Sequence, residues 1–266
     1  KEYIFIFSMS NIFSVYFCET YLISIDHKFF KKYSKNKSLI KQQYENQTGK
    51  KWDTRTLFEI YKDLKKENPN IVMDIGQNFL EVDSNSIFSL SGIENAQTVY
   101  CNENGYYSIY NADRYGFNNP DSVWDNNKVD YLLVGDSFTH GLCVNRPNDI
   151  ASVLRTLSNK TVINLGWRGN GPLSEYAILR EYLNPNVKKV IWLYYEGNDL
   201  LDLKHEMQNK ILTSYIENYK FSQDLKLKTV ILREKKLIIH KYLEKIINDK
   251  FFNFVKLHKL RSFIKT

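Results

Sequence analysis

A largely apolar run from Val129 to Val134 stops at Gly135-Asp136-Ser137, and this boundary constrains the fold more than any other stretch. A short apolar run bounded by a glycine is typical of a buried β-strand. In an open α/β sheet, ligands bind beyond the carboxyl ends of the strands. The sequence therefore predicts that the hydroxyl of Ser137 lies at the binding edge of a parallel sheet.

The same pattern recurs twice further along the chain. A predicted strand near 161–165 leads into a loop that contains Gly169, and a predicted strand near 189–195 leads to Gly197-Asn198. A glycine lets a backbone N–H approach a ligand closely because no Cβ intervenes. Taken singly, such residues are also typical of an ordinary turn or a helix N-cap. Three in succession, each after a β-rich run, favour a functional site.

These three strand ends carry the residue types that acyl transfer requires. A serine hydroxyl is a weak nucleophile that needs a base and donors for the oxyanion that forms. Ser137 is the candidate nucleophile, and the N–H groups of Ser137 and Gly169 with the Asn198 amide are candidate oxyanion donors. The next glycine after Ser137 is Gly141, so the Gly-x-Ser-x-Gly elbow is absent and the α/β-hydrolase fold is disfavoured.

Over about a quarter of its length, Val129 to Leu203, the chain resembles the SGNH hydrolases, or GDSL esterases and lipases. Their catalytic serine block corresponds to Gly135-Asp136-Ser137, their oxyanion glycine block to Asn164 and Gly169, and their carboxamide block to Gly197-Asn198-Asp199. The stretch 110–119 also looks like the lead-in of membrane-anchored bacterial members. The resemblance implies a three-layer α/β/α sandwich with a parallel, flavodoxin-like sheet, and hydrolysis or transfer of an ester-linked acyl group.

The Asp-x-x-His block that supplies the family's general base has no good match. Only Asp202-Leu203-Lys204-His205 has the spacing, and its place just after the third block indicates two solvated side chains of a charged helix. His140 is expected to lie along the surface of the helix that follows Ser137. We expect the base, and the last strands of the sheet, to lie beyond Thr266, so that this chain alone is an inactive fragment.

The N-terminus differs in composition from the rest. Tyr3 to Ile25 is apolar and aromatic, with Glu19 as the only formal charge, and about twenty apolar residues span a bilayer. The sequence predicts a membrane anchor or signal-anchor at 1–27, with a buried N-terminal helix as the alternative. The lysines at 28–51 favour a cytoplasmic side by the positive-inside rule. The resemblance instead favours a membrane-anchored protein whose catalytic domain lies outside the cytoplasm.

The remaining chain is predicted to comprise a mixed α/β extension at 28–125 and the SGNH domain at 126–266. Helices are predicted at 54–66, 147–157 and 172–182, the last two each with a proline near the start. Short strands are predicted within 78–118, and residues 205–260 read as helical. The apolar residues between 225 and 246 alternate with lysines, which predicts a helix that covers the sheet with its lysines in water, or one that touches a membrane surface.

Composition excludes several classes of function. The net charge of +7 is spread along the chain, so no nucleic-acid partner is expected. The three cysteines are too few for a disulfide scaffold; Cys101 and Cys143 either pair or remain buried thiols. No cysteine and histidine cluster has metal-ligand spacing, so no metal and no cofactor are expected.

The leading hypothesis is a membrane-anchored bacterial serine esterase that hydrolyses acyl esters, acetyl esters among them, on an envelope glycan or lipid. Its catalytic residues are Ser137, Gly169 and Asn198, and its partner is an acylated small molecule or glycan. Two alternatives stay open. One is an O-acyltransferase of a surface polysaccharide with the same fold, and the other is a non-catalytic module that binds an envelope glycan.

Overall fold

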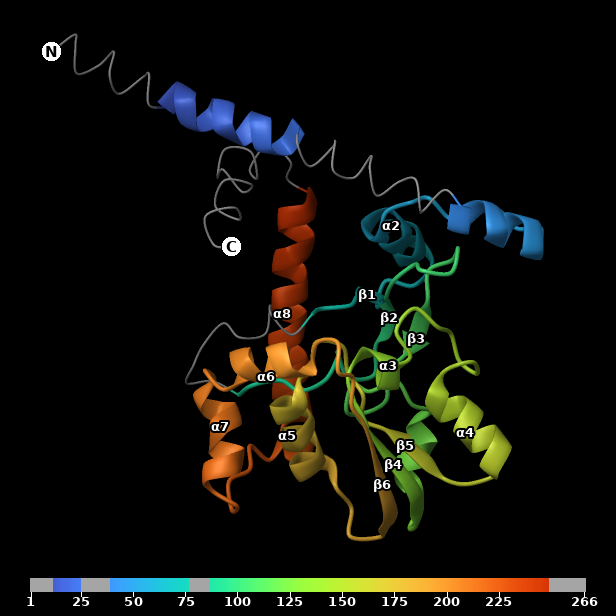
Figure 1. Ribbon diagram of the computed structural model, residues 1–266, viewed down its shortest axis with the longest axis vertical. Helices are drawn as coiled ribbons and strands as arrows, with labels where there is room; N and C mark the ends of the chain where they lie inside the picture. Colours follow the sequence, from blue (N-terminus) through green and yellow to red (C-terminus); the bar gives the residue numbers. More distant parts are fainter. Residues whose placement is uncertain (1–11, 25–38, 77–86, 249–266) are drawn as a thin grey trace, which may run out of the picture. The chain divides into compact units, whose positions relative to one another are not determined.

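The structure is a computed structural model that describes residues 12–24, 39–76 and 87–248 (Figure 1). The chain divides into two compact units, one formed by Lys1–Trp52 with Tyr242–Thr266 and the other by Asp53–Lys241. In the first unit, residues 12–24 and 39–48 are helical, and the ring of Tyr44 meets that of Trp52 edge-on at 5.6 Å. The candidate site residues all belong to the second unit.

The predicted membrane anchor is not found. Among the described residues, no helix has both the length and the apolar character that crossing a bilayer requires. The prediction of an anchor at 1–27, and of the membrane-anchored, extracytoplasmic location that depended on it, is therefore wrong for this part of the chain. Residues 1–11 and 25–27 of the predicted anchor lie outside the described residues.

The second unit contains a parallel sheet with the strand order β5-β4-β6. Its strands are β4 (Val129–Gly135), β5 (Val162–Asn164) and β6 (Val187–Leu193). Both outer strands run parallel to β4. The prediction of an α/β protein with a parallel sheet is confirmed, although β6 begins and ends two residues before the predicted 189–195.

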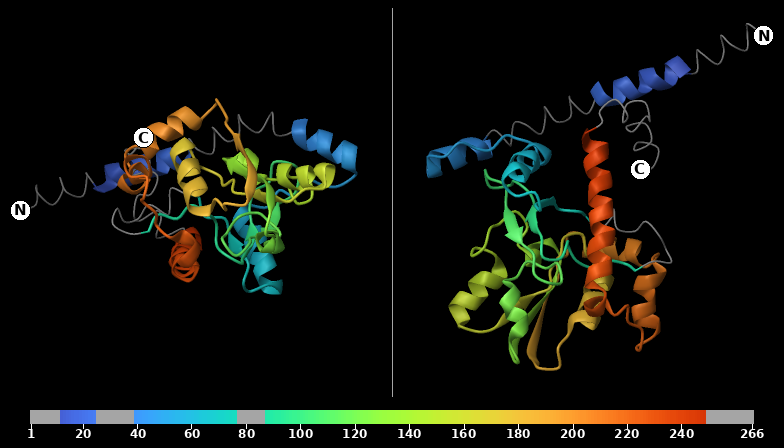
Figure 2. Two further views of the ribbon diagram at one scale, coloured as in Figure 1. Left: turned by 90° about the horizontal axis from the view of Figure 1, so that it is seen from below. Right: turned by 180° about the vertical axis from the view of Figure 1, so that it is seen from behind.

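Alternate residues of β4 pack into different hydrophobic clusters, because successive side chains of a strand point to opposite faces. Leu132 and Val134 join a cluster with residues of α5 (Pro172–Tyr182), whereas Leu133 packs with Ala151 of α4 (Ile150–Ser158). The two helices lie on opposite sides of the sheet (Figure 2). Both faces of β4 are therefore buried, which explains why its sequence is a nearly continuous apolar run.

Capping residues set where the helices begin. The helix α5 starts at Pro172 as predicted, with proline in the first turn. The helix α4 starts three residues after the predicted Pro147, because the side chain of Asp149 accepts a hydrogen bond from the Ser152 N–H at 3.0 Å and caps the first turn. In α2 (Leu57–Glu67), Thr56 and Glu59 form a reciprocal capping box, so the helix starts after the predicted residue 54.

A second, smaller sheet consists of β1 (Val72–Met73), β2 (Gln97–Val99) and β3 (Ile109–Asn111), in that order. Strand β2 is parallel to β1 and antiparallel to β3. Two of these strands fall within the predicted stretch 78–118, of which residues 78–86 lie outside the described residues. Asp74 lies one residue past β1 and forms an ion pair with Arg168, in the loop that follows β5.

The described residues from 205 onward are mostly helical, as predicted, with turns and loops at 207–209 and 218–224. They form α6 (Asp199–Glu206), α7 (Lys210–Glu217), the 3-10 helix η3 (Leu225–Leu227) and α8 (Thr229–Asn248). Leu232 of α8 joins the main core. The prediction that the lysines of this helix lie in water is wrong for Lys236, whose ammonium is buried and pairs with Glu94 at 2.6 Å.

Candidate functional site

Ser137 is the first residue of α3 (Ser137–His140), immediately beyond the end of β4. Gly135 has a φ of +159°, and a Cβ there would collide with the Thr139 hydroxyl. The Asp136 side chain caps α3 by accepting from the Phe138 N–H at 3.0 Å. The Ser137 hydroxyl is partly buried and lies 3.4 Å from the Asp136 carboxylate. The strand, the close approach and the cap together fix the serine at the carboxyl end of the central strand.

Gly169 lies in the loop that joins β5 to α5. Its φ of +78° is in the left-handed region that favours glycine. At the start of the loop, the Asn164 side chain accepts from the Gly166 N–H at 2.8 Å and donates to the Thr139 carbonyl at 2.6 Å. Asn164 is fully buried, so this pair of bonds ties the Gly169 loop to the helix that carries Ser137.

Asn198 occupies the N-cap position of α6 but its side chain does not cap the helix. Its amide donates instead to the Asp202 carboxylate at 2.7 Å, and its buried carbonyl oxygen has no hydrogen-bond partner among the described residues. An amide nitrogen carries two N–H groups, so one donor remains beyond the bond to Asp202. The helix-cap alternative therefore does not account for the side chain of Asn198.

The strand order brings the three predicted site residues to one edge of the sheet. Ser137 follows the central strand β4, and Gly169 and Asn198 follow its two hydrogen-bonded neighbours. Contacts link the three segments. A Cβ at Gly171 would lie 2.7 Å from the Asp202 side chain, and the rings of Phe138 and Tyr195 are 4.9 Å apart. Ser137 and Asn198 each hydrogen-bond to a carboxylate within their own segment.

None of the described histidines forms a hydrogen bond with the Ser137 hydroxyl. His140 is fully buried, contrary to the prediction that it lies along the helix surface. Its Nδ1 is 3.2 Å from the Tyr100 hydroxyl, and burial, together with the nearby Arg168 charge, lowers the pKa of His140 to about 3. The imidazole is therefore neutral at physiological pH.

His205 is exposed, and the Asp202 carboxylate accepts from Asn198. The spacing Asp202-x-x-His205 therefore does not mark an oriented base. His240 accepts from the Met73 N–H at 2.9 Å. His27 and His258 lie outside the described residues.

Carboxylates gather beneath the three loops. Glu206 accepts from the N–H groups of Gly171, Leu173 and Ser174, so a residue of α6 caps the start of α5. Glu175 is fully buried and accepts from the Trp192 indole at 2.5 Å. Burial above all, with repulsion from the nearby carboxylates of Asp199, Asp136 and Glu206, raises the pKa of Glu175 to about 8, although the Trp192 hydrogen bond opposes the rise. Neither glutamate belongs to a spaced motif, so neither could be found from the sequence.

The lead-in stretch 110–119 forms a buried polar scaffold for the site, a role that the sequence did not indicate. Asn119 exchanges two hydrogen bonds with the backbone of Asn164, at 2.8 and 2.9 Å. Asn118 donates to the carbonyl of His140 at 3.0 Å. Asp113 accepts from Asn119 and from Trp124, which lies in the 3-10 helix η2 (Asp121–Asp125). The clustering of Asn, Asp and aromatic residues in this stretch is the sequence feature that could have indicated a structural role.

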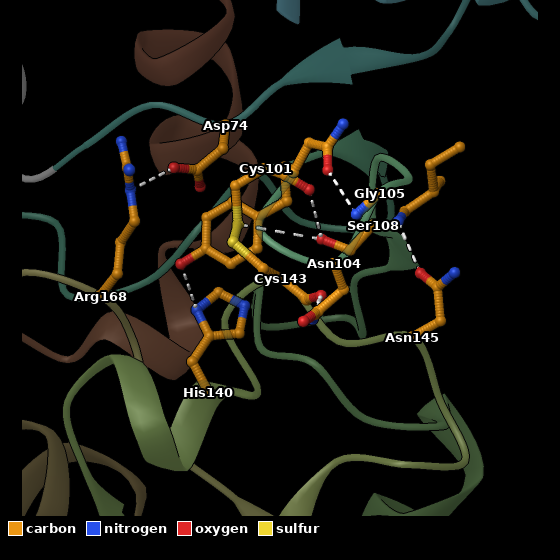
Figure 3. Close-up of a disulfide and its surroundings, with 12 residues drawn as sticks. Asp74, Cys101, Asn104, Gly105, Ser108, His140, Cys143, Asn145 and Arg168 are labelled. Carbon is orange, nitrogen blue, oxygen red and sulfur yellow. Dashed lines mark hydrogen bonds and ion pairs between the residues drawn. A yellow bond between two sulfur atoms is a disulfide. The ribbon is translucent and has the colours of Figure 1, made fainter. Parts of the chain in front are cut away.

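Two further links border the site (Figure 3). Cys101 and Cys143 form a disulfide, which resolves the two possibilities that the sequence left open. The bond joins the segment after β2 to the segment after α3. Nearby, Arg168 of the Gly169 loop forms an ion pair with Asp74, with Nε 2.5 Å from a carboxylate oxygen.

Searches against protein families, curated proteins and solved structures find no match to this chain. Among the described residues, no group of three or more His, Cys, Asp or Glu side chains is arranged to hold a metal ion. The functional interpretation therefore depends on the geometry of the site.

Proposed function

We propose that this chain is a serine esterase of the SGNH type, which hydrolyses acyl esters of a glycan or lipid through an acyl-enzyme. The observation that carries the proposal is the strand order β5-β4-β6, which puts Ser137 between the Gly169 loop and Asn198. The proposal extends the observed sheet to a three-layer α/β/α sandwich. The burial of β4 between α4 and α5 supports that extension.

In the proposed reaction, the Ser137 hydroxyl oxygen attacks the acyl carbonyl carbon and its proton passes to a base. The first N–H groups of a helix lack intrahelical acceptors, so the Ser137 N–H is suited to bind the oxyanion. The Gly169 N–H and the second N–H of the Asn198 amide complete the donor set. Collapse of the intermediate expels the alcohol, which takes up a proton. Water then attacks the acyl-serine and releases the acid.

A phosphonylation experiment tests the nucleophile. The chain is treated with a fluorophosphonate probe with and without added imidazole, which supplies a base from solution. We expect an adduct on Ser137 that forms faster with imidazole, and none in Ser137→Ala; Ser122→Ala, at an exposed serine, is the matched control. Intact mass and peptide mapping locate the adduct. Folded wild-type protein that stays unlabelled on Ser137 with imidazole present refutes the proposal.

A second candidate function is a non-catalytic module that binds a glycan. It is favoured by one observation, that none of the described histidines hydrogen-bonds to the Ser137 hydroxyl. This candidate predicts no labelling under any of the conditions above, together with retained binding of a glycan in Ser137→Ala. If labelling succeeds, the products formed from an acyl ester with and without a carbohydrate acceptor separate hydrolysis from acyl transfer.

A further inference from the structure

Arg168 lies between Trp167 and Gly169, within the loop that follows β5. The backbone N–H of Trp167 donates to the Gly135 carbonyl at 3.3 Å, so this part of the loop runs beside the end of β4. The Arg168 side chain extends to Asp74, with which it forms an ion pair (Figure 3). Asp74 follows β1 and is held by its own N–H, which donates to the Val99 carbonyl at 3.0 Å. The pair thus links the Gly169 loop to the smaller sheet.

The guanidinium packs against the smaller sheet, although the Arg168 side chain is 39% exposed. A Cβ at Gly76 would lie 3.0 Å from Nη2 of Arg168, so the chain after β1 passes directly against the guanidinium. The guanidinium carbon also lies 5.5 Å from the centroid of the Tyr100 ring, within the range of a cation–π contact. Asp74, Gly76 and Tyr100 all belong to the smaller sheet or its immediate extensions.

The charges make the pair strongly coupled. The Asp74 side chain is 2% exposed, and among the described residues its carboxylate has no partner besides Arg168. Arg168 is therefore its ionic partner in this part of the chain. Burial raises the pKa of Asp74 to about 6, and the Arg168 charge opposes that rise. The carboxylate is thus ionised at neutral pH, and its unpaired charge would be costly.

We propose that Asp74 and Arg168 act as positioning residues, which hold the Gly169 N–H in place for the oxyanion by anchoring the loop to the smaller sheet. This inference rests on the proposed function, because it assigns a purpose to the loop as an oxyanion loop. Its physical basis is the adjacency of Arg168 and Gly169. A side chain fixed by a buried counter-charge restricts the backbone of the next residue. A misplacement of about 1 Å at a reacting group costs roughly 100-fold in rate.

The kinetic test uses the phosphonylation of Ser137 in the presence of imidazole. We expect Arg168→Gln to lower the maximal labelling rate by roughly 10- to 100-fold, with little change in the probe concentration that gives half that rate. Arg168→Lys keeps the charge and should restore part of the rate. The matched control is Arg55→Gln, which removes an exposed arginine that pairs with Asp53 and Asp63. An unchanged rate in folded Arg168→Gln overturns the inference.

A second measurement separates this inference from the proposed function. Hydrogen–deuterium exchange of the peptide that spans 166–171 is compared in wild type, Asp74→Asn and Arg55→Gln. Faster exchange confined to Asp74→Asn supports the anchoring role whether or not Ser137 is ever labelled. Failure of the proposed function shows instead as absent labelling in the wild type. Exchange that is equal in all three proteins overturns the anchoring role.

Discussion

The side-chain amide of Asn164 donates to the backbone carbonyl of Thr139 at 2.6 Å, which joins the loop after β5 to the helix that carries Ser137. The same side chain accepts from the Gly166 N–H at 2.8 Å, so it serves both as donor and as acceptor. A single buried carboxamide therefore sets the spacing between two of the proposed catalytic segments. Asparagine supplies both a donor and an acceptor at this reach, whereas an ionised aspartate lacks the donor.

Replacing Asn164 tests this link. We expect Asn164→Asp to lower the free energy of unfolding by about 1–3 kcal/mol at neutral pH, since its carboxylate would face the Thr139 carbonyl without a donor. At acid pH the protonated side chain can donate again, so part of the loss should be recovered. Urea unfolding at two pH values measures both effects. The control is Asn126→Asp, an exposed asparagine that donates to the Val123 carbonyl at 3.1 Å. Equal losses in the two variants would contradict the role of Asn164.

The second prediction concerns the contribution of the disulfide between Cys101 and Cys143 to stability. It closes a loop with a sequence separation of 42, for which chain-entropy arguments give a stabilisation of about 2–4 kcal/mol. We expect Cys101→Ser/Cys143→Ser to unfold at lower temperature than the oxidised wild type. A reducing agent should lower the melting temperature of the wild type to the same extent and leave the double variant unchanged. A wild type that is insensitive to reduction would show that the bond does not stabilise the fold.

How much the sequence could predict depended on whether a feature was local. The strand β4 and the helix α5 follow from short patterns, an apolar run that ends in glycine and a proline in the first turn. The ends of β4 and β5 are also marked by local sequence, so the prediction that Ser137 and Gly169 follow strand ends was correct. The strand β6 was predicted two residues late, because the aromatic residues 194 and 195 extend its β-like pattern past its hydrogen bonds to β4.

The connections between distant segments could not be predicted. Asp74 and Arg168 are ordinary charged residues in sequence, and only the packing of the smaller sheet brings them together. The burial of His140 was missed because its partners, Tyr100 and Tyr110, come from a separate sheet. The membrane anchor was predicted from apolar composition alone, and no described helix is long and apolar enough to cross a membrane.

The third prediction concerns the contribution of the buried ion pair between Lys236 and Glu94 to stability. The Lys236 ammonium also donates to the Gly92 carbonyl at 2.6 Å, and both side chains are almost fully buried. Breaking such a pair strands a buried charge, so we expect Lys236→Met to lower the free energy of unfolding by about 3–5 kcal/mol. Adding Glu94→Gln should recover much of that loss. Denaturant unfolding measures both, with Lys241→Met at an exposed position of the same helix as the control. Additive losses in the double variant would refute the coupling.

Finally, the raised pKa of Glu175 predicts that the stability of the protein depends on pH. Its pKa is about 8 in the folded protein against an ordinary value of 4.5, mainly because it is buried. Between these values the folded state binds more protons than the unfolded state, so the free energy of unfolding falls as pH rises from about 4.5 to 8. Glu175→Gln keeps an acceptor for the Trp192 indole but cannot ionise. We therefore expect the variant to be more stable than wild type by a few kcal/mol at pH 9, and the difference to vanish near pH 4. Thermal unfolding across this pH range measures the difference, and parallel curves for the two proteins would show that Glu175 does not titrate in the folded state as described.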